Sequence, residues 1–307
     1  MQKTLGGTME FAGIALHTGA ETSVCVLPGE ADTGYRFRRT DIKGAPEVEA
    51  SVHNIKDTLL ATSLGLNGAS VKTVEHLLSA LAGSGVDNAV IEVSGDEVPI
   101  MDGSAAPFVR GVEIVGLVEQ EVPKKMLRIL RRISAGENGS TATLDPAETF
   151  RVSFTIEFEH ALVGRQAMDF QYSPEAFARE IAYARTFGFL KDVQMMMDRG
   201  LALGGSLDNA VVVGDDRILN PGGLRSPDEF VRHKILDSIG DLSLLGIPII
   251  GAYSGHRAGH RINRLLMQEV LANPSHWDLV LVQEGGEGSD RYHEIDPADA
   301  QPIAYAL

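Results

Sequence analysis

The sequence contains very little cysteine, with Cys25 alone among 307 residues. One cysteine excludes an internal disulfide and a thiolate cage for zinc, and it fits a reducing compartment. Cys25 stands in a run typical of a β-strand, residues 22–27, so we expect it to be a small, buried hydrophobic residue.

Long apolar segments are also lacking. The longest, residues 244–253, is far shorter than a membrane span and contains Pro248. The first 25 residues contain no basic segment followed by an apolar block, so they predict no secretory signal. We therefore expect a soluble, cytoplasmic protein.

Positive charge is scarce, because 27 Lys and Arg face 42 Asp and Glu, for a formal net charge of −15. This balance argues against nucleic acid as the main partner, since phosphate binding needs clustered cations. An anionic small substrate stays compatible with it, because a local pocket can oppose the overall sign. The hydrophobic content of 44% is that of an ordinary globular protein.

The order of predicted elements indicates two domains, as the length also does. The first third alternates short strand-like runs, such as 89–93, with turns, and it contains a helix over about Thr73 to Ala82. A charged stretch with Pro123 then precedes a fresh strand region at 126–133. We place the domain boundary in that stretch.

The second part repeats the plan of the first. Strands at 150–158 precede a helix that begins at Ser173, a glycine-rich insert and a long helix. Ser226, Pro227 and Glu229 form a capping box at the start of the long helix, and Gly246 and Pro248 end it. We therefore predict an α+β fold of two similar domains, each a sheet covered by helices. The expected ranges are 1–122, 126–280 with the insert at about 187–210, and an acidic tail at 281–307.

The long helix carries the first candidate metal ligands. His233, Asp237 and Asp241 recur every four residues and form one polar ridge. A His and an Asp one turn apart can reach the same metal ion. A solvated polar face is the alternative interpretation of this helix.

The first helix opens with Glu75 and His76, which lie off the centre of its apolar stripe. A hydrolytic zinc site needs three protein ligands, an open position and a carboxylate that does not bind the metal. His76 with His233 and Asp237 supplies the three ligands, and Glu75 supplies the carboxylate. Alternatively, Glu75 only interacts favourably with the helix dipole.

Two further segments are candidates for function. Residues 255–263 place His256 and His260 among glycines at a strand-to-helix turn. A histidine there can protonate a leaving amine. Alternatively, either histidine is a loop residue without a function. The glycine-rich loop 200–206 suggests a rival function, a kinase-like nucleotide binder, although no Gly-Lys-Ser/Thr follows it. A purely structural zinc is a third hypothesis, which Glu75 and the lack of cysteine disfavour. Residues 99–108 read as a turn at a sheet edge.

Seven of these strings, taken together, resemble the bacterial UDP-3-O-acyl-N-acetylglucosamine deacetylases. They run in family order from about residue 2 to about residue 272, and they are residues 13–19, 73–77, 99–108, 185–189, 204–210, 232–242 and 259–260. The resemblance implies two similar sheet-and-helix sandwich domains of the α+β class with the active site between them, and a zinc-dependent amidohydrolase of lipid A biosynthesis. Its expected reaction removes the N-acetyl group of an acylated UDP-amino sugar, which yields the free amine and acetate in the committed step of that pathway.

The resemblance also implies roles for single residues. His76, His233 and Asp237 match the zinc ligands, although two His and a carboxylate also suit Fe²⁺. Glu75 matches the general base, His260 the general acid with Asp241 as its partner, Thr186 an oxyanion-stabilising hydroxyl and Lys234 a substrate-contacting cation. His256 matches no role.

The resemblance further implies the substrate contacts. Phe158 matches an aromatic residue near the uridine, and Thr58 is a further expected contact. A hydrophobic passage for the acyl chain is expected to include Phe187, Phe189, Val193, Ala202 and Ala210, for which ordinary packing is the alternative. The expected partners are therefore a small-molecule substrate and, transiently, the inner membrane surface, but not nucleic acid.

The chain departs from the family pattern at two places. The turn at 136–140 is acidic and polar where relatives carry a basic residue for the diphosphate, so that contact is in doubt. Ala61 stands where some relatives have a cysteine near the metal.

Overall fold

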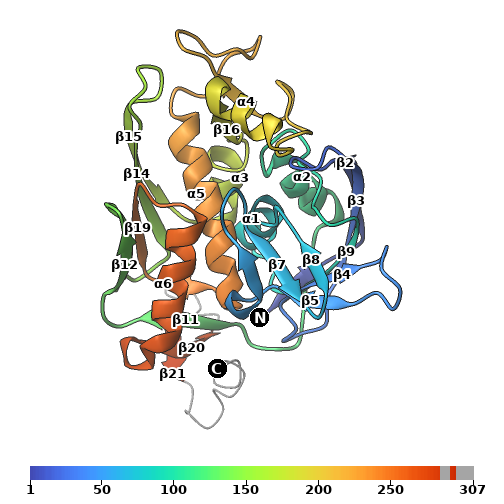
Figure 1. Cartoon of the computed structure of the whole chain (residues 1–307). Helices are drawn as coiled ribbons and strands as arrows, with labels where there is room; N and C mark the ends of the chain where they lie inside the picture. Colours follow the sequence, from blue (N-terminus) through green and yellow to red (C-terminus); the bar gives the residue numbers. More distant parts are fainter. Residues whose placement is uncertain (284–290, 295–307) are drawn as a thin grey trace.

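Two five-stranded sheets form the outer layers of the molecule, and the helices α1 and α5 pack against each other between them (Figure 1). The computed structural model describes residues 1–283 and 291–294. The helices are α1 (Glu75–Gly83), α2 (Ala106–Val115), α3 (Pro174–Glu180), α4 (Leu190–Asp198), α5 (Glu229–Leu242) and α6 (His260–Ala272), with 3-10 turns at Val52–Asn54, Ser243–Leu245 and Pro274–His276.

The two large sheets have the same topology. The first has the strand order β2-β3-β9-β4-β5, in which only β9 and β4 are parallel. The second has the order β12-β13-β19-β14-β15, in which only β19 and β14 are parallel. The predicted α+β class and the repeated plan are thereby confirmed, whereas the range limits at 122, 126 and 280 stay a prediction.

Most strands of the first half, β3, β4 and β9 among them, alternate buried and more exposed residues, as half-buried strands do. They are β1 (Lys3–Leu5), β2 (Met9–Ile14), β3 (Glu21–Pro28), β4 (Tyr35–Arg39), β5 (Glu47–Glu49), β6 (Ile55–Asp57), β7 (Ser63–Leu66), β8 (Ala69–Val71), β9 (Ala89–Ser94) and β10 (Leu117–Glu119). Strands β6, β7 and β8 form a small separate sheet beside α1 (Figure 1).

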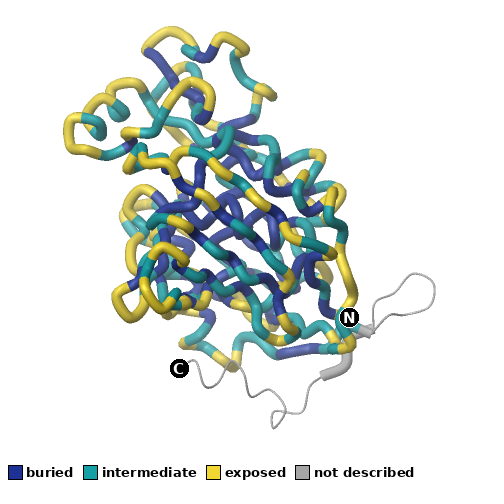
Figure 2. Tube along the Cα trace, turned by 90° about the vertical axis from the view of Figure 1, so that its right-hand side faces the viewer, coloured by how far each residue is buried: buried dark blue, intermediate teal, exposed yellow. Residues whose placement is uncertain are grey.

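The strands of the second half follow the same pattern; in β14, Val152, Phe154 and Ile156 are buried and their neighbours are not. They are β11 (Lys125–Ile129), β12 (Ile133–Glu137), β13 (Ser140–Asp145), β14 (Arg151–Glu157), β15 (Arg165–Gln171), β16 (Phe187–Phe189), β17 (Val211–Val213), β18 (Ile249–Ile250), β19 (Ala252–His256), β20 (Trp277–Gln283) and β21 (Arg291–Glu294). Buried residues concentrate between the layers, and exposed ones follow the loops (Figure 2).

Gly240 of α5 lies against the start of α1. A Cβ atom at this position would lie 2.1 Å from the carbonyl oxygen of Glu75, the first residue of α1. The missing side chain therefore lets the backbones of the two halves approach each other where the polar residues of both helices meet.

The first helix begins at Glu75, the residue expected to open it, and Thr73, its approximate limit in the sequence, has a φ of +55°, outside the helical region. The long helix begins at Glu229 without the expected capping box. The Glu229 carboxylate instead accepts hydrogen bonds from Arg185 Nε at 2.8 Å and from the backbone N–H of Arg225 at 2.6 Å.

The expected burial of Cys25 is also wrong, since its exposure is intermediate. Its strand alternates, and Val24 and Val26 occupy the core-facing positions, so Cys25 points to the opposite face of the sheet. Most of the expected acidic tail, residues 284–290 and 295–307, lies outside the described residues.

Among the described residues, no helix combines the length and apolarity that crossing a membrane would require.

Candidate metal centre

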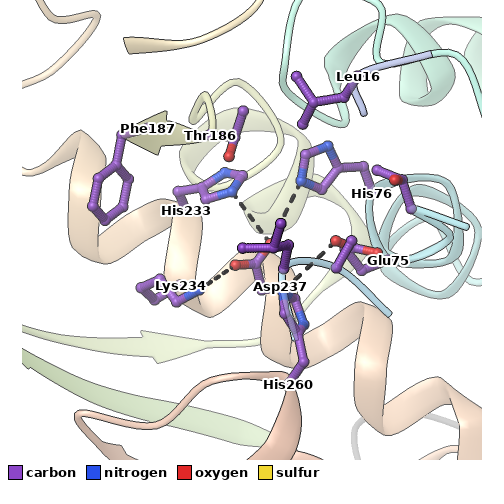
Figure 3. A pocket seen from close by; sticks show the side chains of 12 residues that line it. Leu16, Glu75, His76, Thr186, Phe187, His233, Lys234, Asp237 and His260 are labelled. Carbon is purple, nitrogen blue, oxygen red and sulfur yellow. Dashed lines mark hydrogen bonds and ion pairs between the residues drawn. The ribbon is translucent and has the colours of Figure 1, made fainter. Parts of the chain in front are cut away.

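Three residues from both halves offer ligand atoms to one point. His76 lies in the first turn of α1, and His233 and Asp237 lie one turn apart on α5. Their ligand atoms all lie within 4.8 Å of one another, and the three residues are buried. Asp237 Oδ1 lies 3.3 Å from His233 Nε2 and 3.6 Å from His76 Nε2 (Figure 3).

The donor set fits a divalent cation. Asp237 Oδ1 is buried and accepts no hydrogen bond from the part of the chain that the structure describes. His233 Nδ1 lies 3.0 Å from the carbonyl oxygen of Ala184, which leaves Nε2 as the free ligand atom. Burial lowers the pKa of His233 to about 4, so the imidazole is neutral and able to bind a metal at neutral pH. Two His and one Asp leave an open position for a reacting group.

The second oxygen of Asp237 is occupied. Asp237 Oδ2 accepts a hydrogen bond from Lys234 Nζ. Burial alone would raise the pKa of Asp237, but its interactions with His233 and with the Lys234 ammonium group outweigh burial and hold that pKa well below its usual range. Asp237 Oδ1 therefore faces His76 and His233, and Oδ2 faces the ammonium group of Lys234.

Glu75 lies beside this cluster without belonging to the ligand set. Its side chain is buried, its Oε2 accepts the backbone N–H of Thr62 at 3.1 Å, and its Oε1 lies 3.6 Å from His260 Nε2. Burial raises the pKa of Glu75 above its ordinary value. A carboxylate with a raised pKa can accept a proton near neutral pH, as a general base must.

His260 opens α6 on the other side of the cavity, and Asp241 holds it. His260 Nδ1 lies 2.8 Å from Asp241 Oδ2. Burial would lower the pKa of His260, but the carboxylates of Asp241 and Glu75 outweigh burial and raise that pKa to about 9. The imidazole is therefore protonated at neutral pH. A buried carboxylate with a raised pKa and a protonated imidazole thus lie 3.6 Å apart beside the ligand cluster.

These groups share one cavity. Its walls come from both halves and are formed by Leu16, Leu60, Ala61, Thr73, Glu75, His76, Thr186, Phe187, His233, Lys234, Asp237 and His260. Asp241 lies behind His260, to which it is hydrogen-bonded, and is almost fully buried. The alternative of a solvated polar face on α5 is therefore wrong, because His233, Asp237 and Asp241 are all buried.

Phe187, the first residue of β16, and Thr186, which directly precedes it, reach the cavity. The N–H of Thr186 donates to the carbonyl of Gly103 at 2.8 Å, so a turn of the first half helps to hold this segment. Phe187 packs edge-on against Phe230 of α5, with ring centroids 4.9 Å apart, and 6.3 Å from the ring of His233.

The other expected substrate contacts are not among the residues that line this cavity. Phe189 ends β16, Val193 lies on α4, and Ala202 and Ala210 follow in the loop before β17. Phe158 directly follows β14. Its ring packs against the rings of Phe187 and Phe189, with centroid distances of 5.8 and 5.5 Å. Thr58 lies in the loop that leads to Leu60 and Ala61 of the cavity wall.

Two candidates lie apart from the cavity. His256 ends β19, is partly exposed and lies 3.5 Å from Glu157. The loop 200–206, on which the kinase-like hypothesis rests, uses two of its backbone N–H groups in hydrogen bonds within the protein. The N–H groups of Leu203 and Gly204 donate to the carbonyls of His17 and Leu16, so these two are not free to hold a phosphate.

Several residues that support the site were missed. Glu97 is fully buried and accepts the Thr73 hydroxyl at 2.8 Å and the His17 N–H at 3.1 Å. The turn 99–108, expected to be only a sheet edge, contributes Asp102, which pairs with Arg225 at 2.8 Å across the two halves. The spacing of residues in the sequence did not indicate the Thr73–Glu97 or the Asp102–Arg225 contact, because the partners are distant in sequence.

Comparisons with known proteins agree on one family. The family model described as UDP-3-O-acyl N-acetylglycosamine deacetylase matches residues 2–272. The chain is 47% identical over 307 residues to a protein of Thioalkalivibrio sulfidiphilus, with 99% of this chain and 97% of the relative covered. It is 48% identical over 279 residues to one of Myxococcus xanthus, covering 91% and 89%, and 43% identical over 293 residues to one of Hahella chejuensis, covering 95% and 97%. All three relatives are named UDP-3-O-acyl-N-acetylglucosamine deacetylase.

Proposed function

The chain belongs to the UDP-3-O-acyl N-acetylglycosamine deacetylase family, and we propose that it hydrolyses the N-acetyl group of a UDP-3-O-acyl-N-acetylglucosamine in lipid A biosynthesis. The products are the free amine and acetate. One observation carries the proposal: Glu75 and His260, whose pKa values are both raised, lie 3.6 Å apart beside a buried cluster of three ligand atoms. Amide hydrolysis needs a base and an acid in that arrangement.

The metal we propose is zinc, held by His76, His233 and Asp237. The mixed nitrogen and oxygen set with an open position is typical of catalytic zinc, and Fe²⁺ is the runner-up for the same donors. When bound there, such an ion supplies Lewis-acid chemistry that polarises a carbonyl and makes a water molecule more acidic.

The protein residues divide the proton transfers. We assign to Glu75 Oε1 the removal of a proton from the attacking water, because Oε2 is held by the Thr62 N–H. The Thr186 hydroxyl stabilises the developing oxyanion, and His260 Nε2 delivers a proton to the departing amine while Asp241 holds Nδ1. Lys234 lines the cavity and offers a cation to the substrate while it also pairs with Asp237.

The insert between β16 and β17 supports recognition of an acyl chain. Four large apolar side chains are exposed on it and available to bind an apolar group: Leu190, Met195, Leu203 and Leu207 are 41–52% exposed. Together with Phe187, Phe189, Val193, Ala202 and Ala210, they are the proposed passage. Shortening the acyl chain should then lower kcat/KM sharply, and equal rates on a substrate without the chain would contradict the passage.

The same exposed side chains motivate the proposed transient contact with an inner membrane surface. Co-sedimentation with lipid vesicles tests it, and binding that is unchanged when Leu203 and Leu207 are replaced by serine would contradict it. The cytoplasm stays the proposed compartment, which cell fractionation tests.

The function is tested by acetate release and metal content measured together. We expect the wild type, purified without added metal, to contain about one zinc or iron per chain and to release acetate from UDP-3-O-acyl-N-acetylglucosamine. A wild type that is free of metal and cannot be reconstituted would remove the proposed mechanism. ATP binding in the absence of metal would instead favour the kinase-like alternative.

A further inference from the structure

Thr62 lies where the two halves meet, yet it contacts none of the three proposed metal ligands through a hydrogen bond that the structure describes. It directly precedes β7 of the small sheet beside α1 and is 1% exposed. Its neighbour Ala61 lines the cavity, whereas Thr62 itself stands behind the cavity wall. A buried threonine at such a place must satisfy its polar groups with protein partners.

Thr62 uses these groups to hold the two carboxylates on which the proposed proton transfers depend. Its backbone N–H donates to Glu75 Oε2 at 3.1 Å. Its hydroxyl donates to Asp241 Oδ1 at 2.6 Å. Its carbonyl accepts the N–H of Val74 at 3.2 Å, which ties the same residue to the entrance of α1. Both hydrogen bonds to the carboxylates are of the charge-assisted kind, which are the stronger ones.

The hydrogen bond to Glu75 makes its two oxygens different. With Oε2 held by the Thr62 N–H, Oε1 is the oxygen that lies 3.6 Å from His260 Nε2. A carboxylate held at one oxygen cannot rotate freely, so the other oxygen keeps one direction. The proposed base therefore presents a fixed atom to the cavity.

The hydrogen bond to Asp241 acts on the proposed acid. Asp241 Oδ2 already accepts from Asn263 Nδ2 at 2.8 Å and lies 2.8 Å from His260 Nδ1, and the Thr62 hydroxyl satisfies the remaining oxygen. Without that hydroxyl, Oδ1 is a buried oxygen that loses its donor, and the carboxylate can turn about its Cβ–Cγ bond to seek another. The imidazole of His260 would turn with it.

We infer that Thr62 is a positioning residue that sets the general base and the general acid at a fixed distance from each other. This inference rests on the proposed function, since it needs Glu75 and His260 as base and acid. Thr62 acts through both residues and touches neither substrate nor metal ligand. Its loss should therefore lower kcat while KM and metal content stay unchanged, because binding and metal coordination use other atoms.

The test compares Thr62→Val, which replaces the hydroxyl by a methyl group of similar size, with Thr62→Ser, which keeps a hydroxyl. Thr4→Val is the matched control, because Thr4 is a buried threonine whose hydroxyl donates to the backbone carbonyl of Asn88 at 2.8 Å, outside the cavity. We measure kcat, KM, metal content and the thermal midpoint for all three and the wild type.

We expect Thr62→Val to lower kcat about tenfold to a hundredfold, with KM within about twofold and one metal ion retained, as the loss of a hydrogen bond to a charged group predicts. Thr62→Ser should recover most of that loss, and Thr4→Val should lose stability but not kcat. Should Thr62→Val not fold, Thr62→Ala takes its place in the comparison.

A kcat of Thr62→Val equal to that of Thr4→Val would overturn the inference while the deacetylase function stands. A Thr62→Ser variant as slow as Thr62→Val would also overturn it, because the hydroxyl would then not matter. A wild type that releases no acetate would overturn the proposed function, and with it this inference.

Discussion

The two halves share a topology but build their parts of the site differently. α1 and α5 occupy equivalent places in the chain. α1 lies between the strand pair β4-β5 and the central strand β9, and α5 lies between the pair β14-β15 and the central strand β19. α5 offers His233, Asp237 and Asp241 at regular four-residue spacing along a buried helix of 14 residues. α1 is 9 residues long and offers only Glu75 and His76, both in its first turn.

The difference concerns how each half controls the direction of its side chains. On α5 the helix itself sets the direction, because residues four apart lie on one face. The start of α1 depends on its surroundings instead. Thr73 has a φ of +55°, a strained conformation for a β-branched residue, and its hydroxyl donates to the buried Glu97. One half thus uses regular geometry, and the other uses a turn held by tertiary contacts.

The largest effect is expected when either helix loses its histidine ligand to the metal. His76→Ala and His233→Ala should each lose the metal ion and all measurable activity, because two remaining ligands cannot hold it at a site built for three. Elemental analysis of the purified proteins checks this. His256→Ala is the control, since His256 is partly exposed and pairs with Glu157, and it should keep both metal and activity. Metal retention in either ligand variant would show that the two halves do not share one ion.

The next effect separates the two neighbours at the start of α1. Glu75→Gln should keep the metal but lower kcat by about 10²–10⁴-fold, the usual contribution of a general base. Steady-state kinetics and metal analysis on the same sample measure it, with exposed Glu49→Gln as the control. If Glu75→Gln lost its metal, the division between base and ligand would be wrong.

A third change separates the helices without replacing any polar side chain. A Cβ at Gly240 would lie 2.1 Å from the carbonyl oxygen of Glu75, so Gly240→Ala must push α1 away from α5. We expect a loss of about 1–3 kcal/mol in the free energy of unfolding and about 10²-fold in kcat/KM, since small displacements of catalytic groups are costly. Denaturant unfolding and kinetics check it. Gly222→Ala is the control, because a Cβ there meets nothing within 4 Å, and an equally mild effect at both positions would contradict the close approach.

The smallest effect concerns pH. His260, with its pKa raised to about 9, must be protonated to act as the acid, so kcat/KM should fall as pH rises through about 9. Glu75 must be ionised, so activity should also fall as pH drops through its raised pKa. Asp241→Asn removes the carboxylate that raises the pKa of His260, and the alkaline limb should move to lower pH. A limb that stays in place in a pH–rate profile would assign it to another group.

Much of the α5 side of the site could be predicted from the sequence, because helical spacing converts sequence positions into a shared face. The expected helix at 173, the strand at 89–93 and the strand-to-helix turn before His260 are also confirmed for this reason, since each has a local signal. The capping box at Ser226 failed because Arg185, 44 residues from Glu229, takes the carboxylate that the box would use.

The sequence by itself determined the two-sandwich plan and which residue types could bind a metal, because periodicity and side-chain chemistry are local properties. Only the tertiary structure decided that Thr62 is hydrogen-bonded to both Glu75 and Asp241. It also decided that the backbone of α1 at Glu75 approaches Gly240 closely, and that Glu97 accepts the hydroxyl of Thr73. Those partners are up to 179 residues apart. Their geometry arises when two sheets bury their helices against each other, and no window of sequence contains both sides of that contact.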